Sequence, residues 1–119
     1  MALEVVRRTL APGVAVLEIR GRITLGLDTR RLEEMASQIE REGVTRLVLD
    51  LAGVDYMDSA GLGVLIHCAN AMRNAGGALH IAGANTKIQQ LLKVTRLEGL
   101  IPSYAGVEQA RAAFAAQPS

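Results

Sequence analysis

Aromatic residues are scarce in this chain of 119 residues, which has no tryptophan, two tyrosines and one phenylalanine. Only Tyr56, Tyr104 and Phe114 could stack on nucleic-acid bases, and no basic run surrounds them. The 13 basic and 12 acidic side chains give a formal net charge of +1, with both signs interspersed. Such a balance provides no field that would hold nucleic acid or an anionic membrane surface. We therefore expect neither nucleic acid nor a membrane as a partner.

Cysteine and long apolar segments are also nearly absent. Cys68 is the single cysteine, so no disulfide can form within the chain, and a thiol in the protein core is the simplest interpretation. No stretch is long and apolar enough to span a bilayer. The N-terminus lacks the charged start and apolar run of a secretory signal. These absences predict a cytoplasmic protein.

The length and the share of apolar residues predict a single folded domain. Half of the residues (50%) are hydrophobic, which allows one core of ordinary size. No internal repeat, linker or low-complexity segment offers a domain boundary. We expect one domain over residues 1–119, with residues 116–119 as a frayed tail.

The first third of the chain predicts a β-hairpin followed by a helix. Residues 3–9 and 14–20 are rich in Val, Leu and Ile and flank a turn signal, and Gly21 is expected to end the second strand. Alternation in that strand directs Ala15, Leu17 and Ile19 toward the core. After a loop through Gly26, apolar residues at helical spacing predict a helix over about 28–42. Its apolar stripe consists of Leu32, Met35, Ala36 and Ile39.

Residues 46–63 carry the most information. Residues 47–51 form a short apolar run with a single charge, which is typical of a strand buried on both faces of a sheet. A loop is expected to follow this strand. Asp58 and Ser59 are both helix-capping residue types, and a long stretch with helical apolar periodicity comes directly after them. One of the two side chains is therefore expected to accept hydrogen bonds from the first free N–H groups of a helix.

The helix predicted after this cap has one apolar stripe and an unusual pair of glycines. The stripe consists of Leu62, Leu65, Ile66, Ala69 and Met72. Gly61 and Gly63 fall in the first turn, although glycine is unfavourable inside a helix. Their presence indicates that a backbone approaches closely there, either from the protein's own sheet or from a partner.

The remaining segments complete an α/β fold. Residues 74–77 should end the helix, residues 78–82 read as a strand, and the succession of strand, helix and strand implies a right-handed parallel crossover. Asn85 or Thr86 should cap a third helix, followed by a short strand near Ile101 and a closing helix over 107–116. We predict a single α/β domain with a mixed sheet of four or five strands and about four helices.

Ser59 is the main candidate for chemistry, and its residue type and position are compatible with three roles. As a nucleophile it has half of the turn that presents the catalytic serine of α/β-hydrolases, but Met57 stands where that turn needs glycine. His67, on the same predicted helix, and His80, within a predicted strand, are poorly placed to act as its base. The other two roles are a plain helix cap and a serine that is modified or contacted by a partner.

No nucleotide, metal or other cofactor is predicted. Gly61-Leu62-Gly63 is followed by Ile66 where a dinucleotide-binding motif needs its third glycine, and no phosphate-binding loop with Gly-Lys-Ser/Thr occurs. Asp50, Asp55 and Asp58 lack an obvious further ligand, so a strand charge, a turn and a cap are the simpler assignments.

The stretch after the central strand resembles a known family. It reads Met57-Asp58-Ser59-Ala60-Gly61-Leu62-Gly63-Val64-Leu65 and is followed by Gly76-Gly77 and another strand. This motif resembles the signature of STAS domains, specifically of bacterial anti-sigma factor antagonists. Gly21-Arg22-Ile23 and Val94-Thr95-Arg96-Leu97 extend the similarity over nearly the whole chain.

The resemblance implies a phosphorylation switch at Ser59. In such antagonists the matching serine is phosphorylated by an anti-sigma factor with serine kinase activity, and a serine phosphatase reverses the modification. The unphosphorylated form captures the anti-sigma factor and releases the sigma factor. Relatives without phosphorylation serve as stressosome scaffolds or as the STAS partner of a lipid transport ATPase. The family often has an acidic residue shortly after the glycine that matches Gly21, whereas this chain has Thr24 there.

A partner surface follows from the predicted crossover, because the loop around Thr24 and the start of the Ser59 helix should lie at one edge of the sheet. Met57 has two open interpretations, a staple between helix and core or an exposed partner contact. The sequence leaves the oligomeric state open. The residues predicted to contact the partner are Thr24, Met57, Asp58, Ser59, Ala60, Gly61, Leu62, Gly63 and His67.

Overall fold

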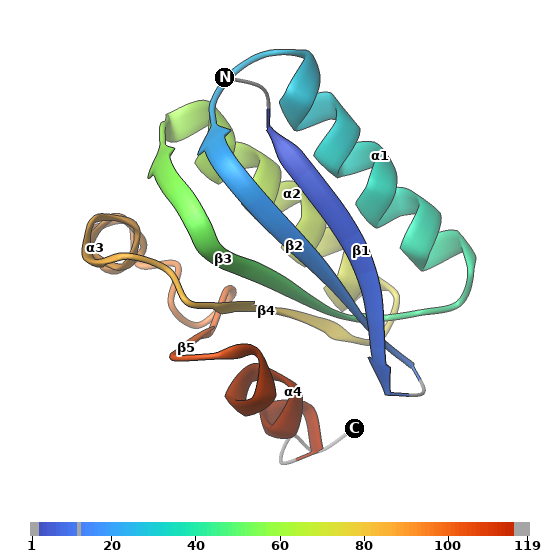
Figure 1. Ribbon diagram of the computed structural model, residues 1–119. Coiled ribbons are helices and arrows are strands. Elements are labelled where there is room, and N and C mark those ends of the chain that lie inside the picture. Colours follow the sequence, from blue (N-terminus) through green and yellow to red (C-terminus); the bar gives the residue numbers. More distant parts are fainter. Residues whose placement is uncertain (1–2, 12, 116–119) are drawn as a thin grey trace.

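The computed structural model describes residues 3–11 and 13–115, and within them five strands form one sheet in the order β1-β2-β3-β4-β5 (Figure 1). β1 is antiparallel to β2, and the other neighbouring strands are parallel. α1 and α2 cover one face of the sheet, and α4 lies on the other. The predicted mixed sheet with about four helices is therefore confirmed. The elements are β1 (Glu4–Ala11), β2 (Val14–Ile23), α1 (Leu27–Arg41), β3 (Arg46–Met57), α2 (Ser59–Asn74), β4 (Ala78–Ala82), α3 (Thr86–Val94), β5 (Ser103–Tyr104) and α4 (Val107–Ala115).

Two apolar layers hold the helices to the sheet. The larger layer contains the predicted inward side chains of β2, Ala15, Leu17 and Ile19, together with the buried stripes of α1 and α2. The alternate side chains of the strands point to the other face, where they meet α4. That second layer consists of Val14, Val16, Val48, Ala82, Ala110 and Phe114.

His80 and Cys68 are both buried in these layers. The His80 ring stacks on Phe114 with centroids 3.9 Å apart, and its Nδ1 lies 2.8 Å from the carbonyl oxygen of Ala110. Burial lowers the pKa of His80, so the ring is favoured in its neutral form. Burial raises the pKa of the Cys68 thiol to about 12, with Glu33 adding to the effect. The interpretation of Cys68 as a core thiol is confirmed.

Two predicted strand ends are wrong. β2 does not end at Gly21 but continues to Ile23, with Gly21 at φ 109° and a register shift against β3 directly after it. β3 does not stop at residue 51 but continues to Met57, where a loop was expected. The two extensions pair with each other, Ile23 opposite Met57, so each supplies the hydrogen-bonding partner of the other.

Other boundaries agree with the sequence or shift slightly. The helices begin and end within about a turn of their predicted positions, and β4 covers the predicted residues 78–82. β5 follows Pro102 instead of including the buried Ile101, because Pro102 has no N–H to donate to a ladder. Pro12 of the predicted hairpin turn and the predicted tail 116–119 lie outside the described residues. No helix in the described part of the chain is long and apolar enough to cross a bilayer.

Candidate functional site

Ser59 is the first residue of α2, and its neighbour Asp58 is the cap. The Asp58 carboxylate accepts a hydrogen bond of 2.8 Å from the N–H of Gly61, and its carbonyl oxygen accepts from the N–H of Leu62. A cap at this position satisfies one of the free N–H groups of the first turn. The interpretation of Ser59 as a plain cap is therefore wrong. Its side chain is exposed, and no residue within 3–11 and 13–115 forms a hydrogen bond with its hydroxyl.

The end of β2 fixes the position of this helix start. The carbonyl oxygen of Ile23 accepts a hydrogen bond of 3.3 Å from the N–H of Asp58. A Cβ at Gly61 would lie only 2.1 Å from the same oxygen, so the first turn of α2 presses directly against β2. At Gly61 the backbone that approaches closely is therefore that of the protein's own sheet, and a residue without a Cβ is needed there. Thr24 follows Ile23, so the structure places the Thr24 loop beside the start of α2.

An exposed row of residues runs along α2 from Ser59. Ser59, Gly63 and His67 are spaced by one helical turn and all three are exposed. A Cβ at Gly63 would meet no atom within 4 Å, so this glycine is not required by the protein's own packing. His67 Nε2 lies 3.9 Å from a carboxylate oxygen of Glu33 on α1. The row therefore borders α1, and a shallow groove of about 410 Å³ lies between the two helices, lined by Arg30, Glu33, Glu34, Ser37, Arg41 and His67.

Not every residue of the predicted partner surface is accessible. Met57 is 6% exposed and Leu62 7%, and both belong to the main core. The alternative of an exposed Met57 is therefore wrong, and its side chain packs in the core. Gly61 is also buried. The residues of the predicted surface that reach solvent at least in part are Thr24, Asp58, Ser59, Ala60, Gly63 and His67.

Leu25 is a feature that sequence reasoning missed. It is 82% exposed, more than any other large apolar residue among those the structure describes. It lies directly after Thr24, in the loop beside the start of α2. An isolated leucine in a loop has no periodicity from which its exposure could be predicted. The signal available in the sequence was its position directly before Gly26, a residue type that marks turns and loops, and Gly26 adopts a φ of 151° in the structure.

Neither histidine is placed to activate the Ser59 hydroxyl. His67 lies eight residues further along α2, about 12 Å along the helix axis. His80 is fully buried against α4. Asp50 accepts a hydrogen bond from the N–H of Ala52 within β3, and no group of three potential metal ligands was found in the described part of the chain.

Comparisons with known proteins identify the family and the fold. A family model described as the STAS domain matches residues 6–110. The anti-sigma-B factor antagonist of Staphylococcus aureus is 31% identical over 77 residues, which are 65% of this chain and 71% of that protein. An anti-sigma factor antagonist from Mycobacterium paratuberculosis has the same fold, with a TM-score of 0.80 at 20% identity over 96% of this chain and 95% of that one. The Bacillus cell fate determinant SpoIIAA in its phosphorylated form superposes with a TM-score of 0.75 at 14% identity, over 92% of this chain and 98% of that one.

Proposed function

The chain belongs to the STAS domain family, and from this premise we propose that it is an anti-sigma factor antagonist controlled by phosphorylation of Ser59. In its unphosphorylated form it binds an anti-sigma factor, and a sigma factor is released. The anti-sigma factor is a serine kinase that modifies Ser59, and a serine phosphatase restores the binding form. The names of the similar proteins support the binding of an anti-sigma factor. The solved phosphorylated form of SpoIIAA supports control by phosphorylation.

One observation carries this proposal. Ser59 is exposed at the start of α2 while Asp58 makes the capping hydrogen bond to Gly61, so the serine hydroxyl has no structural task. A kinase can reach such a hydroxyl without unfolding the helix. A phosphate placed there meets the free N–H groups and the positive end of the helix dipole.

Intact-mass measurement tests the proposal directly. The purified chain is mixed with each candidate anti-sigma factor and ATP, and we expect one of them to add a single phosphate. The Ser59→Ala variant serves as the control and should gain no mass. Phosphate transfer to the variant, or no transfer from any candidate kinase, would contradict the assignment of Ser59.

A second candidate function is an interaction or scaffold subunit that is never phosphorylated. Thr24 favours it, because the family often has an acidic residue at this place near the serine. The mass experiment distinguishes the two functions when it is combined with a binding measurement. A partner that binds the chain but transfers no phosphate supports the scaffold.

The Ser59→Ala variant is expected to keep the fold and nearly all of its stability. Asp58 holds the capping hydrogen bond, so the loss of the Ser59 hydroxyl leaves the helix start intact. Asp58→Ala is the matched comparison and should cost about 1 kcal/mol, a shift of a few degrees in Tm. Thermal unfolding followed by circular dichroism measures both. A larger loss for Ser59→Ala than for Asp58→Ala would show that the serine is primarily structural.

The proposed partner surface predicts which substitutions weaken binding. Thr24→Arg and Leu25→Ser alter half-exposed or exposed side chains beside the start of α2, and His67→Glu alters an exposed side chain about two turns further along the helix, so the folds of the variants should be unchanged. Each substitution is expected to lower the affinity for the anti-sigma factor by about tenfold. This is the effect of losing one well-buried contact or of placing an unfavourable group against it. Val94→Ser is the control for Leu25→Ser, because Val94 is also exposed, at 69%, but lies at the end of α3. Calorimetric titration that finds parental affinity for all three variants would exclude this surface.

A further inference from the structure

β1 is an edge strand of unusual openness. It has eight residues and pairs along one side with β2, and no other strand among the described residues pairs with its second side. The opposite edge of the sheet is β5, which has only two residues. A long edge strand presents a row of N–H and C=O groups on which another strand can pair. Proteins often shorten, cover or interrupt such an edge.

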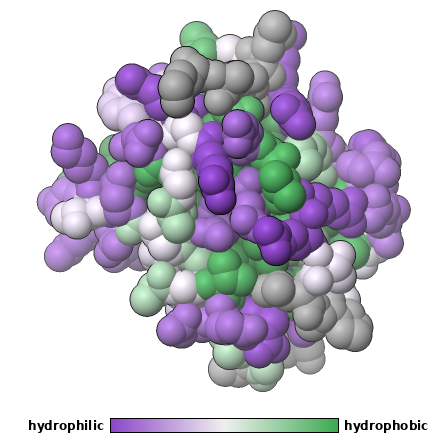
Figure 2. All heavy atoms as spheres, viewed as in Figure 1, coloured by the Kyte–Doolittle hydropathy of each residue, from purple (hydrophilic) through white to green (hydrophobic). Residues whose placement is uncertain are grey.

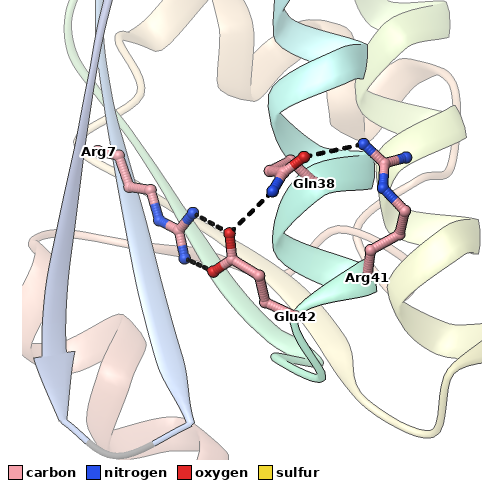
Figure 3. A network of polar contacts seen from close by, with 4 residues as sticks. All are labelled: Arg7, Gln38, Arg41 and Glu42. Atoms are coloured by element: carbon pink, nitrogen blue, oxygen red, sulfur yellow. Dashed lines mark hydrogen bonds and ion pairs between the residues drawn. The ribbon is translucent and has the colours of Figure 1, made fainter.

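The side chains of β1 differ strongly between its two faces. Val5 points toward the core and Arg7 toward the end of α1, where its guanidinium binds Glu42 at 3.0 Å from one carboxylate oxygen (Figure 3). Gln38 also donates to Glu42, and the Arg7 contact is the main reason that the pKa of Glu42 falls to about 2. The charge of Arg7 is therefore matched within the chain.

The exposed side chains Glu4, Val6 and Arg8 lie on the face opposite α1.

The face that carries Glu4, Val6 and Arg8 mixes charge with exposed apolar surface, and Figure 2 shows hydrophilic and apolar residues side by side on this view of the molecule. Val6 is 53% exposed, although valine in a strand usually packs against a neighbour. It lies between an acidic and a basic residue at equal spacing along the strand.

We infer that this edge is a self-association surface: two copies of the chain pair their β1 strands antiparallel about a two-fold axis at Val6. In that register each Val6 meets the Val6 of the second copy. Glu4 of each copy stands opposite Arg8 of the other, so two pairs of opposite charge form at once. A two-fold interface requires such self-complementarity.

Residues on the neighbouring strand extend this complementarity. Within one copy Glu4 stands opposite Arg20 on β2, and Arg8 forms an ion pair with Glu18. In the proposed dimer Arg20 and Glu4 of one copy therefore line up with Arg8 of the other, and Glu18 of that second copy, which stands opposite its own Val6, lies diagonal to Arg8. Arg8 is 64% exposed in its side chain, so it can contact a second carboxylate.

Charge selects this register over its neighbours. Because the side-chain period is two, every two-fold register centred on a residue of β1 keeps these three side chains on a shared face, and three of these registers are centred on Glu4, Val6 or Arg8. Centring on Glu4 would place two carboxylates opposite each other, and centring on Arg8 would place two guanidinium groups together. Like charges directly opposite each other are destabilising. The register centred on Val6 avoids both conflicts, and it is the one two-fold register that places Glu4 of each copy opposite Arg8 of the other.

The inference is independent of the function proposed above. β2 separates β1 from β3, and Ser59 follows the carboxyl end of β3. Pairing through the lateral edge of β1 leaves the start of α2 accessible in both copies. A dimer would therefore present two partner-binding sites, and failure of either proposal leaves the other intact.

Charge reversal provides a sharp test. Sedimentation equilibrium across a wide range of concentrations should show a reversible dimer of the parent chain. Glu4→Arg alone places basic side chains opposite each other, and Arg8→Glu alone places acidic ones opposite each other. Because the two-fold axis doubles each substitution, either variant should raise the dimer Kd by about tenfold or more.

A mixture of the two variants separates the interface from effects within one chain. When Glu4→Arg is mixed with Arg8→Glu, opposite charges again face each other in the heterodimer, and dimerisation should return. Circular dichroism checks that both variants are folded. A parent chain that stays monomeric, single variants that dimerise as well as the parent, or a mixture that stays monomeric would overturn the inference.

Discussion

A phosphate on Ser59 is expected to weaken the chain's binding to its anti-sigma factor by about a hundredfold or more, without a large change of conformation. A phosphoserine adds about two negative charges at neutral pH. Asp58 is adjacent, so the combined charge is dense on a surface that must press against a partner. Charge that is left desolvated or opposed at an interface typically costs several kcal/mol, which corresponds to this loss of affinity.

The structure explains why the fold should tolerate the phosphate. Ser59 is exposed, and the capping hydrogen bond between Asp58 and Gly61 does not involve its hydroxyl. The start of α2 is also fixed by backbone contact with Ile23, which a side-chain modification does not alter. The free N–H groups and the dipole of the helix favour a negative group at this position.

Affinity and backbone amide chemical shifts of the unmodified and phosphorylated chains measure both parts of this prediction. Shift changes should be confined to the start of α2 and the Thr24 loop. Ser59→Asp should imitate the phosphate only partly, because a carboxylate carries less charge and volume. Equal affinities would contradict the switch, and shift changes that reach α4 or β1 would contradict its local action.

The parts of the fold that the sequence predicted are those with strong local signals. α2 and α3 combine apolar periodicity with the capping residues Asp58 and Asn85, and both caps form in the structure. β4 is a short apolar run between turn residues, and its bounds agree with the prediction. In such segments residue preference, periodicity and tertiary packing all favour one structure.

The second half of β3 was missed because its local signals contradict its structure. Residues 52–55 include Gly53 and Asp55, which are typical of a loop, yet the strand continues through them. Pairing with the end of β2 supplies the backbone hydrogen bonds, and Val54 is buried against the helices. Such pairing joins residues that are more than thirty positions apart, so no local pattern contains it.

In the candidate site, too, local signals predicted some features, and tertiary contacts determined the others. Ser59 and its helix could be predicted from the motif and the cap, but the exposure of each side chain could not. Met57 and Leu62 lie in the core, whereas Leu25 is open to solvent. These differences depend on how the end of β2 meets the first turn of α2, which is a tertiary contact.

The two glycines of α2 should respond to alanine in opposite ways. At Gly61 the added Cβ would lie 2.1 Å from the carbonyl oxygen and 2.9 Å from the carbonyl carbon of Ile23. These are backbone atoms of a paired strand, so α2 must move away from the sheet to accept the methyl group. Overpacking of this kind costs about 3 kcal/mol, and Gly61→Ala should lower the Tm by roughly ten degrees.

Gly63→Ala is the matched comparison, because Gly63 lies two residues after Gly61 in the same helix. Its Cβ would meet no atom within 4 Å, and Gly63 is itself exposed on the helix surface. Alanine there should gain up to about 1 kcal/mol in helix propensity and raise the Tm by a few degrees. The new methyl group projects between Ser59 and His67, so affinity for the anti-sigma factor should fall although the fold is more stable.

Thermal unfolding and calorimetric titration of both variants separate the two roles. A stable Gly61→Ala would contradict the close approach to Ile23, and parental affinity of Gly63→Ala would show that the partner does not need the backbone exposed at this turn.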